Sequence, residues 1–404
     1  MKIELISNYL KDPLIRNSFF LMMSSLLFSA FGFVSWVLAA RLYRVDEIGI
    51  ATALISSIAL LVLISRMGLD YSVIRFFKDK DSGALFGTSC FLTTFVALIL
   101  GIFFIFGIDI FSPQLSIIKE YAIFYIIFLL MNSITTIIGT FFIAMRRTKY
   151  HFFQSILINL KIIFLIPLIN LGSLGIFFSY GIGYVIALIV SMIILIRHIN
   201  FPSIKWEILD DSFYFSLGNF IATFFMTCPN MIIPIITLNL LGAEATAYYY
   251  IAYAIASMLF VIPNAFGISL FVEGSYNRNL REIVVKSLGS FIILIPSVAI
   301  IALFGSNILS LIGEDYSVSV DLLILLALSS FFIVICNIYC SILRIKNRMH
   351  DLMLFNGLIF FLLIVLCYVL SDSMGLIGIG YSWVISYGIA SFLILAKGYF
   401  TYRK

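Results

Sequence analysis

RLYRVDEIGIATALISSIALLVLISRMGLDYSVIRF, residues Arg41–Phe76, has the pattern from which the architecture of the whole chain follows. A charged turn comes first, a near-continuous apolar run over Ile48–Ile64 comes next, and a basic segment ends it. About 17–25 predominantly apolar residues are enough for one helix to cross a hydrocarbon core about 30 Å thick. We therefore expect a membrane-spanning helix here, with charged residues at both of its ends.

The same arrangement returns, loosely, in the second half of the chain. NLLGAEATAYYYIAYAIASMLFVIPNAFGISLFVEGS, residues Asn239–Ser275, places a turn with small and acidic residues before a long apolar helix and a polar segment after it. Two halves built on one plan are typical of transporters made from two repeats.

The composition predicts a polytopic α-helical membrane protein. Of 404 residues, 62% are hydrophobic and 11% are charged, whereas soluble domains are about 45–50% apolar and about 25% charged. The alternating pattern of a membrane barrel is absent from the sequence. The net charge of +5 does not indicate nucleic-acid binding, because the basic residues lie in short loops beside helix ends, which is a topology signal.

The cysteines predict neither a metal site nor a redox site. All of them fall inside apolar runs, without CxxC or Cys/His spacing; they are Cys90, Cys228, Cys336, Cys340 and Cys367. No GxxxxGK[ST] loop for a nucleotide occurs. We expect no cofactor.

Hydropathy predicts twelve membrane spans in two lobes of six. We expect an N-terminal lobe over 1–198, a cytoplasmic linker over 199–212 and a C-terminal lobe over 213–404. The predicted spans are 17–40, 47–67, 83–107, 120–145, 151–170, 174–197, 213–241, 245–271, 283–305, 318–343, 351–371 and 375–398.

Charge sets the expected orientation of the bundle. All but four of the 25 basic residues lie in the two termini and in alternate loops that share their side of the membrane, and the other four are Arg41, Arg44, Lys119 and Lys161. By the positive-inside rule, both termini are expected in the cytoplasm.

Lys161 belongs to neither side, because it lies near the middle of the span 151–170, roughly 13–14 Å from either end. A charge at that depth is costly and normally faces a cavity or a partner. His151, Gln154 and Lys161 fall within an arc of about 80° on an ideal helix. One interpretation is a cationic point in an aqueous cavity, and the other is a lysine that snorkels or hydrogen-bonds to a neighbouring helix.

Acidic residues are placed differently, since none lies deep within a predicted span. Exporters of cations that are coupled to protons or sodium usually carry a carboxylate there. Its absence favours an anionic substrate, such as one that carries phosphate.

The seventh span, 213–241, is the strongest of several polar stripes. It carries two prolines that free backbone groups, so Pro229 and Pro234 are candidate hinge residues. The stripe either lines a cavity or packs against other helices through small and hydroxyl residues. Its polar residues are Asn219, Thr223, Thr227 and Asn230.

Two further groups of residues have open interpretations. Arg41, Arg66 and Arg75 are cations at helix ends, which either contact substrate or anchor the topology. A tyrosine cluster begins the eighth span, and either stacks on sugar or forms an interfacial belt; it consists of Tyr248, Tyr249, Tyr250 and Tyr253.

The chain resembles the O-antigen (Wzx-type) flippases, the polysaccharide-transport branch of the multidrug/oligosaccharidyl-lipid/polysaccharide exporter (MOP) superfamily. The resemblance covers most of the chain, on loose motifs: an RxL…G turn, a GL…IRF helix end and an E-x-S helix end. The segments in which the resemblance lies are AARLYRVDEIGIATALISSIALLVLISRMGLDYSVIRFF in the first half, and LLGAEATAYYYIAYAI and SLFVEGS in the second.

The resemblance implies an all-α transporter with two six-helix lobes and a V-shaped, MATE-like, alternating-access cavity, which is often cationic. The first, second, seventh and eighth helices would line it. This chain departs from the pattern in two ways. The usual glycine of the first turn is replaced in RLYRVDEIG, and the middle of the first helix carries no arginine, which leaves Lys161 as the main interior cation.

We therefore expect a flippase, not an enzyme, that moves undecaprenyl-pyrophosphate-linked oligosaccharide, such as O-antigen or capsule repeat units, across the bacterial inner membrane. Lys161 and the basic rim with Arg66 and Arg75 would attract the head group. Membrane lipids, a glycan polymerase and glycosyltransferases are the implied partners. Two alternatives remain: a MATE-like multidrug or small-solute antiporter, and a membrane glycan polymerase or ligase, although the long external loop usual in the latter is missing.

Overall fold

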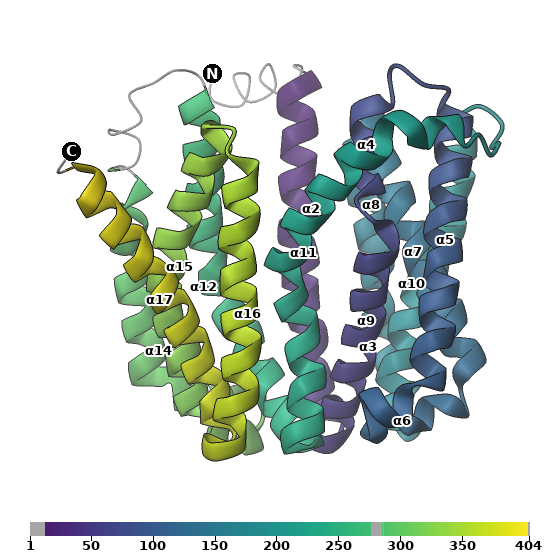
Figure 1. The fold of residues 1–404 in the computed structure, drawn as a ribbon. Coiled ribbons are helices and arrows are strands. Elements are labelled where there is room, and N and C mark those ends of the chain that lie inside the picture. The colour runs from purple at the N-terminus through teal and green to yellow at the C-terminus, as the bar shows by residue number, and fades with distance from the viewer. Residues whose placement is uncertain (1–12, 276–284, 286, 403–404) are drawn as a thin grey trace, which may run out of the picture. The chain divides into compact units, whose positions relative to one another are not determined.

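The computed structural model describes residues 13–275, 285 and 287–402, and these residues form helices and their connections, without a strand (Figure 1). Long apolar runs form helices because every backbone polar group is then bonded within its own segment. The elements are α2 (Pro13–Leu42), α3 (Val45–Arg66), α4 (Leu69–Phe76), α5 (Ser82–Phe106), α6 (Ile108–Phe111), η1 (Pro113–Lys119), α7 (Ala122–Ala144), α8 (Thr148–Asn159), α9 (Lys161–Leu165), η2 (Ile169–Leu171), α10 (Ser173–Ile196), α11 (Glu207–Leu241), α12 (Ala243–Ser275), α14 (Ser290–Ile312), η3 (Glu314–Ser319), α15 (Val320–Ile345), α16 (Met349–Met374) and α17 (Leu376–Tyr402).

Within the described ranges, eleven helices are long and apolar enough to cross a membrane, and they coincide with eleven of the twelve predicted spans. The chain is a multi-pass membrane protein. One span is shifted by seven residues at both ends: α14 begins at Ser290, after the predicted start at 283, and continues to Ile312, past the predicted end at 305. The polar Ser306 and Asn307 suggested a helix end there, but the apolar residues 308–312 extend the helix.

The remaining predicted span, 151–170, is divided into α8, α9 and η2. The backbone tightens at the break, since Leu160 N donates to Leu157 O at 3.1 Å and Ile163 N donates to Leu160 O at 3.0 Å. Bonds that reach back three residues are those of a 3₁₀ turn. Lys161 is the first residue after this break.

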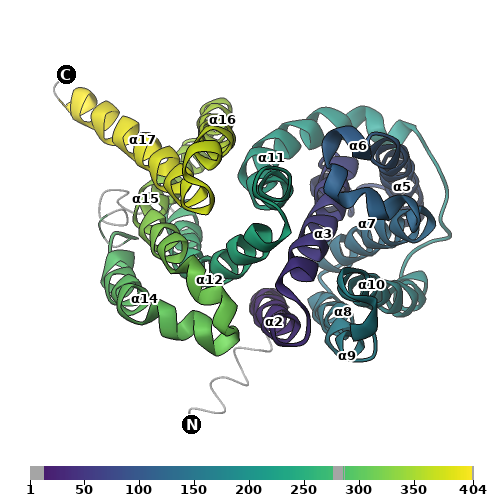
Figure 2. The same ribbon diagram turned by 90° about the horizontal axis from the view of Figure 1, so that it is seen from below.

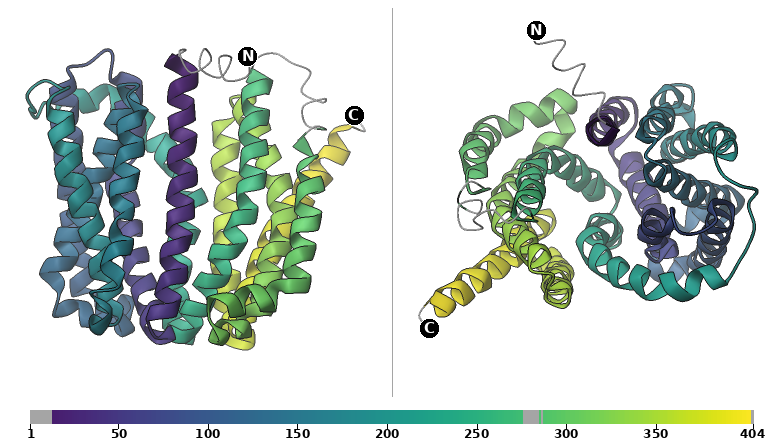
Figure 3. Two further views of the ribbon diagram at one scale, coloured as in Figure 1. Left: turned by 180° about the vertical axis from the view of Figure 1, so that it is seen from behind. Right: turned by 90° about the horizontal axis from the view of Figure 1, so that it is seen from above.

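The chain divides into two compact units. Unit 1 comprises Met1–Tyr43 and Leu54–Ile221, and unit 2 comprises Arg44–Ala53 and Ala222–Lys404. In unit 1, α7 packs against both α5 and α10, and α8 packs against both α10 and α2 (Figures 2 and 3). In unit 2, α15 contacts α12, α14 and α17, and α17 contacts α16. In unit 1, α7 and α8 are each covered by at least two neighbouring helices, and in unit 2, α15 is covered by at least three.

Matching turns recur in the two halves about 200 residues apart. The turn between α7 and α8 places Arg146 at φ 54°, and the turn between α15 and α16 places Asn347 at φ 54°. Arg147 N donates to Phe142 O and Arg348 N donates to Leu343 O, both at 2.9 Å. The helix order that follows each turn is also the same, except that α16 is continuous where α8 and α9 are divided.

A second matching turn leads into the last long helix of each half. Gly172 precedes α10 with φ 56° and ψ −133°, and Gly375 precedes α17 with φ 58° and ψ −137°. Positive φ of this kind suits glycine because it has no Cβ. The repeat seen around Arg41–Phe76 thus extends to the connections, where the sequence signal is only GSLG against GLIG.

The segment before α11 is fixed against the start of α5. Asp81 Oδ2 accepts from Ala84 N at 3.0 Å and so caps α5, as short polar side chains do at helix starts. Asn200 Nδ2 donates to the Asp81 carboxyl and holds the pKa of that group below its usual value. Lys205 N donates to Thr88 Oγ1 at 2.9 Å. This part of the predicted linker is therefore an ordered portion of unit 1.

The first turns of α3 and α12 lie in backbone contact within unit 2. A Cβ built on Gly49 would lie 1.8 Å from Ala243 O, which no rotamer can relieve because the backbone fixes the position of Cβ and Ala243 O is a backbone atom. Small residues allow membrane helices to approach this closely.

We predict that Gly49→Ala lowers the free energy of unfolding by about 1–3 kcal/mol, the cost typical of overpacking. The measurement is thermal unfolding of the purified protein in detergent. Gly32→Ala is the control, because nothing lies within 4 Å of its Cβ position and alanine favours a helix. Equal melting temperatures for the two variants would contradict the close contact.

Candidate functional site

Unit 1 contains a cavity of about 480 Å³, lined by residues of α2, α3, α7, α8 and α10. Most of its lining residues are polar, although it lies among helices that are otherwise apolar. Hydroxyl groups donate and accept hydrogen bonds, so this wall suits a ligand rich in oxygen. The hydroxyl residues of α2 and α7 in the lining are Ser24, Ser25, Ser29, Thr135, Thr136 and Thr140.

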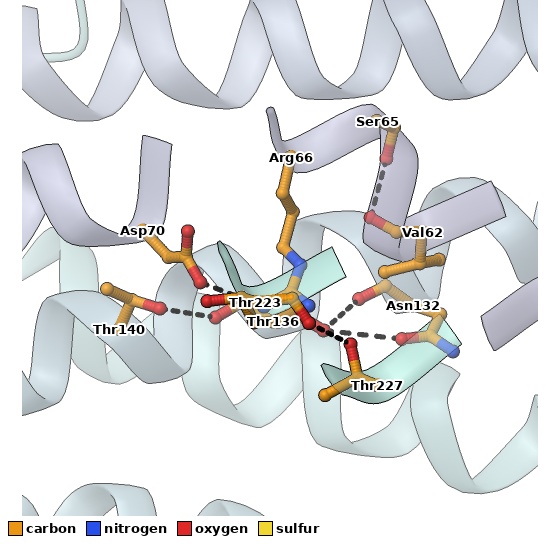
Figure 4. A network of polar contacts seen from close by, with 9 residues as sticks. All are labelled: Val62, Ser65, Arg66, Asp70, Asn132, Thr136, Thr140, Thr223 and Thr227. Carbon is orange, nitrogen blue, oxygen red and sulfur yellow. Dashed lines mark hydrogen bonds and ion pairs between the residues drawn. The ribbon is translucent and has the colours of Figure 1, made fainter. Parts of the chain in front are cut away.

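Arg66 supplies the cationic group of this lining. It is the last residue of α3, and its Nη1 lies 3.1 Å from Asp70 Oδ2 on α4 (Figure 4). Both side chains are 21% exposed. The Nε of Arg66 is buried and has no hydrogen-bond partner among the described residues. A guanidinium has five N–H donors, so one carboxylate leaves donors for a second anion.

The polar stripe of α7 forms a chain of hydrogen bonds (Figure 4). Thr140 Oγ1 donates to Thr136 O at 3.2 Å, and Thr136 Oγ1 donates to Asn132 O at 2.9 Å. Asn132 Nδ2 then donates to Tyr180 Oη on α10 at 2.8 Å. Thr136 and Thr140 line the cavity, while Asn132 joins two helices. These polar residues of α7 therefore both line the cavity and join α7 to α10.

His151 and Gln154, predicted to share a helix face, both line this cavity from α8. Gln154 is buried, and its Nε2 donates to Thr135 O on α7 at 3.0 Å. That bond fixes α8 against α7. His151 Nδ1 is buried and faces the same side of Gly139 as the amide oxygen of Gln154.

Lys161 lies beside the cavity and is not part of its lining. Its Nζ is 5.6 Å from the Tyr180 ring centroid and 6.0 Å from that of Phe28, which does line the cavity. No carboxylate among the residues that the structure describes forms an ion pair with Lys161. Aromatic faces attract a cation by about 0.5–2 kcal/mol. They hold the ammonium group in place and leave its charge uncancelled.

The other predicted residues lie elsewhere. Arg41 is in the last turn of α2, and Arg75 is exposed at the end of α4, where its Cζ is 5.7 Å from the Phe76 ring centroid. The side chain of Asn219 lies outside the described residues. Thr223 accepts through its backbone oxygen from Thr227 Oγ1 at 2.8 Å.

Unit 2 contains a cavity of about 300 Å³, lined by residues of α11, α12, α15, α16 and α17. Thr227, Asn230 and Tyr253 are the three polar lining residues that the sequence had suggested. Its other amides and its tryptophan were not foreseen, because each is a single polar or aromatic residue in a separate apolar run; they are Asn264, Asn337, Asn356 and Trp383.

Pro229 and Pro234 lie inside α11, which runs from Glu207 to Leu241 without a break. A proline removes one backbone donor and places its ring against the preceding turn. Their role as hinge residues stays a prediction.

Comparison with known proteins assigns the chain to a family and a fold. Residues 14–271 match the sequence profile of the family described as "Polysaccharide biosynthesis protein". No curated protein sequence matches the chain.

Several solved structures are similar in fold, among them the following three. An inward-facing multidrug resistance MATE family transporter of the MOP superfamily has a TM-score of 0.70 and 15% identity, over 93% of this chain and 94% of that chain. The lipid II flippase MurJ in an inward closed conformation has a TM-score of 0.72 and 14% identity, over 93% and 86%. A MOP superfamily transporter from Pyrococcus furiosus, described as having a binding pocket of reverse polarity, has a TM-score of 0.61 and 14% identity, over 96% and 95%.

These structural neighbours are transporters and flippases, not catalysts. At such identities the likeness establishes the fold, and the family follows from the match over more than half of the sequence. The chain belongs to the polysaccharide biosynthesis protein family and has the all-α fold of the MOP superfamily transporters.

Proposed function

We propose that this protein is a flippase that moves undecaprenyl-pyrophosphate-linked oligosaccharide, the repeat unit of an O-antigen or a capsule, across the bacterial inner membrane by alternating access. Family membership supports a role in polysaccharide export. The observation that carries the proposal is the uncompensated ammonium group of Lys161 beside a hydroxyl-lined cavity. An intramembrane cation without an acidic partner suits an anionic substrate.

The cavity of unit 1 has groups that suit a pyrophosphate. Arg66 offers guanidinium donors from one wall, and the second amide hydrogen of Gln154 Nε2 offers a neutral one from another. Hydrogen bonds from a charged donor to phosphate oxygens are about twice as strong as neutral ones. The polyprenyl tail would remain in lipid, and no bond would be made or broken.

Orientation and motion complete the proposal. Both termini would lie in the cytoplasm, as the basic loops indicate. The lobes 1–198 and 213–404, joined by the linker 199–212, would rock about the substrate, with bending near Pro229 and Pro234. A glycan polymerase and glycosyltransferases would act on the same lipid-linked unit.

A second candidate is an ion-coupled antiporter for small solutes, which the fold similarity to MATE transporters favours. Such proteins need a carboxylate that can change its charge within the membrane. The acid beside the cavity of unit 1 is Asp70, and it is paired with Arg66 at 3.1 Å. The pairing favours the flippase.

We predict that Lys161→Ala lowers surface glycan about tenfold or more, because a charged hydrogen bond worth roughly 1.5–3 kcal/mol is lost. Lys161→Arg should retain most of the activity. The measurement is surface glycan, together with undecaprenyl-linked repeat units on the cytoplasmic face, in cells deleted for this protein and complemented with each variant.

Lys149→Ala is the matched control for this experiment. Lys149 lies on α8, is exposed, and also contacts an aromatic ring, with its Nζ 4.9 Å from the Tyr150 centroid. Normal surface glycan and protein level in Lys161→Ala would show that the charge is not used. A deletion strain with normal glycan but reduced small-molecule efflux would replace the flippase with the antiporter.

We further predict that the cavity of unit 1 admits water-soluble reagents. With the five native cysteines replaced by alanine, Thr136→Cys should react with a membrane-impermeant maleimide at least about tenfold faster than Ser133→Cys, because thiol reactivity requires access. Thr136 lines the cavity, whereas Ser133 on the same helix is fully buried. Equal rates for the two thiols would contradict an aqueous cavity.

A further inference from the structure

The cavity of unit 2 has a chemistry unlike that of unit 1. We propose that it binds an uncharged pyranose ring of the oligosaccharide, with aromatic rings against the sugar face and Asn356 bonded to one of its oxygen atoms. This inference rests on the proposed flippase function and names the part of the substrate that unit 2 recognises.

The aromatic part of the cavity is built around Trp383. Its ring centroid lies 5.6 Å from that of Tyr253 and 5.7 Å from that of Tyr387. Trp383 itself is buried, whereas the two tyrosines beside it are half-buried and line the same cavity. An aromatic face is electronegative, and the C–H groups on the face of a sugar are weakly positive. The tyrosines thus present a surface on which a pyranose packs.

Amide groups make up the polar part. Asn337 Nδ2 donates to Asn264 Oδ1 at 2.9 Å, which orients both side chains at the cavity wall. Asn356 Oδ1 accepts from Cys340 Sγ at 3.5 Å. Amides both donate and accept hydrogen bonds, as sugar hydroxyl and acetamido groups do. The amides of the cavity and the polar groups of a sugar are therefore complementary.

Asn356 presents a buried amide donor at this wall, unpaired within the described chain. Its side chain is 4% exposed, and its Nδ2 is buried without an acceptor among the described residues. Buried donors in native proteins nearly always have a partner. The residue lines the cavity, so an oxygen atom of a ligand there would supply the missing acceptor.

Charge decides which ligand fits. The described lining of this cavity includes no Asp, Glu, Lys or Arg. Arg344 lies outside the lining, where its Nη2 is 3.4 Å from Sδ of the lining residue Met226, so a phosphate in the cavity would contact no cation of the wall itself. An organic cation would gain from the aromatic rings, but it has no acceptor for the Asn356 amide and meets no carboxylate. A neutral ligand with several oxygen atoms meets every condition. The volume of about 300 Å³ is at the small end of ligand pockets, about 300–1,000 Å³, which suits one ring and not a chain.

Direct binding to the full-length protein in nanodiscs tests the inference. The probe is the repeat-unit oligosaccharide that mild acid releases from the lipid-linked pool of the deletion strain. This released oligosaccharide lacks pyrophosphate. Its binding is measured by isothermal titration calorimetry. Asn356→Leu should raise the dissociation constant about tenfold, as expected for one lost hydrogen bond. Tyr253→Leu should raise it by a similar factor.

Asn307→Leu is the matched control, since Asn307 is exposed on α14 of the same unit and outside the cavity. Thermal unfolding of Asn356→Leu serves as the folding control. We expect that variant to be at least as stable as the wild type, because it removes a buried donor without a partner.

The outcomes separate this inference from the proposed function. If lipid-linked units accumulate in the deletion strain, the flippase function stands. If the free oligosaccharide then does not bind, or binds Asn356→Leu as tightly as the wild type, the sugar site alone is overturned. Competition by tetraethylammonium or by inorganic pyrophosphate at the Asn356-dependent site also overturns it. Without accumulation in the deletion strain, the flippase function itself fails, and the sugar site with it.

Discussion

A polar group in an apolar environment requires a hydrogen-bond partner, and that requirement decides where this chain departs from a continuous helix. Within a helix, backbone N–H and C=O groups are partners for one another. The break before Lys161 is therefore notable, because the 3₁₀ bonds at Leu160 and Ile163 keep the backbone paired while the chain changes from α8 to α9. The corresponding helix of the second half, α16, is continuous, and Leu362 occupies the position 201 residues after Lys161. The charge of Lys161 and the helix break between α8 and α9 thus occur together, and only in the first half of the chain.

The sequence predicted the helices well and the break poorly, for physical reasons. Hydropathy averages over a window, so the apolar run Ile48–Ile64 was enough to place α3. The same average could not detect a backbone bond that reaches back three residues in place of four, because the side chains around Lys161 are as apolar as those of a regular helix. The predicted end at 305 failed for the opposite reason, since two polar residues outweighed an apolar continuation to Ile312.

Periodicity also set the limit on predicting the candidate site. It placed His151 and Gln154 on one face of one helix, and both line the cavity of unit 1. In the cavity of unit 2, the amides that sequence reasoning missed come from different helices, such as Asn337 of α15 and Asn356 of α16. No spacing along the sequence connects such residues, because only tertiary packing brings them together. The tyrosines at the start of α12 were noticed, and Tyr253 among them proves to lie in that wall.

The two cavities show how a repeat can acquire different chemistry in its two copies. The turns at Arg146 and Asn347, and those at Gly172 and Gly375, keep the same backbone geometry, so the scaffold constrains both halves alike. Side chains that face a cavity are free of that constraint. In unit 1 they became cationic and hydroxyl-bearing around Arg66, and in unit 2 amide-bearing and aromatic around Trp383. A substrate with an anionic end and a neutral glycan has one part suited to each.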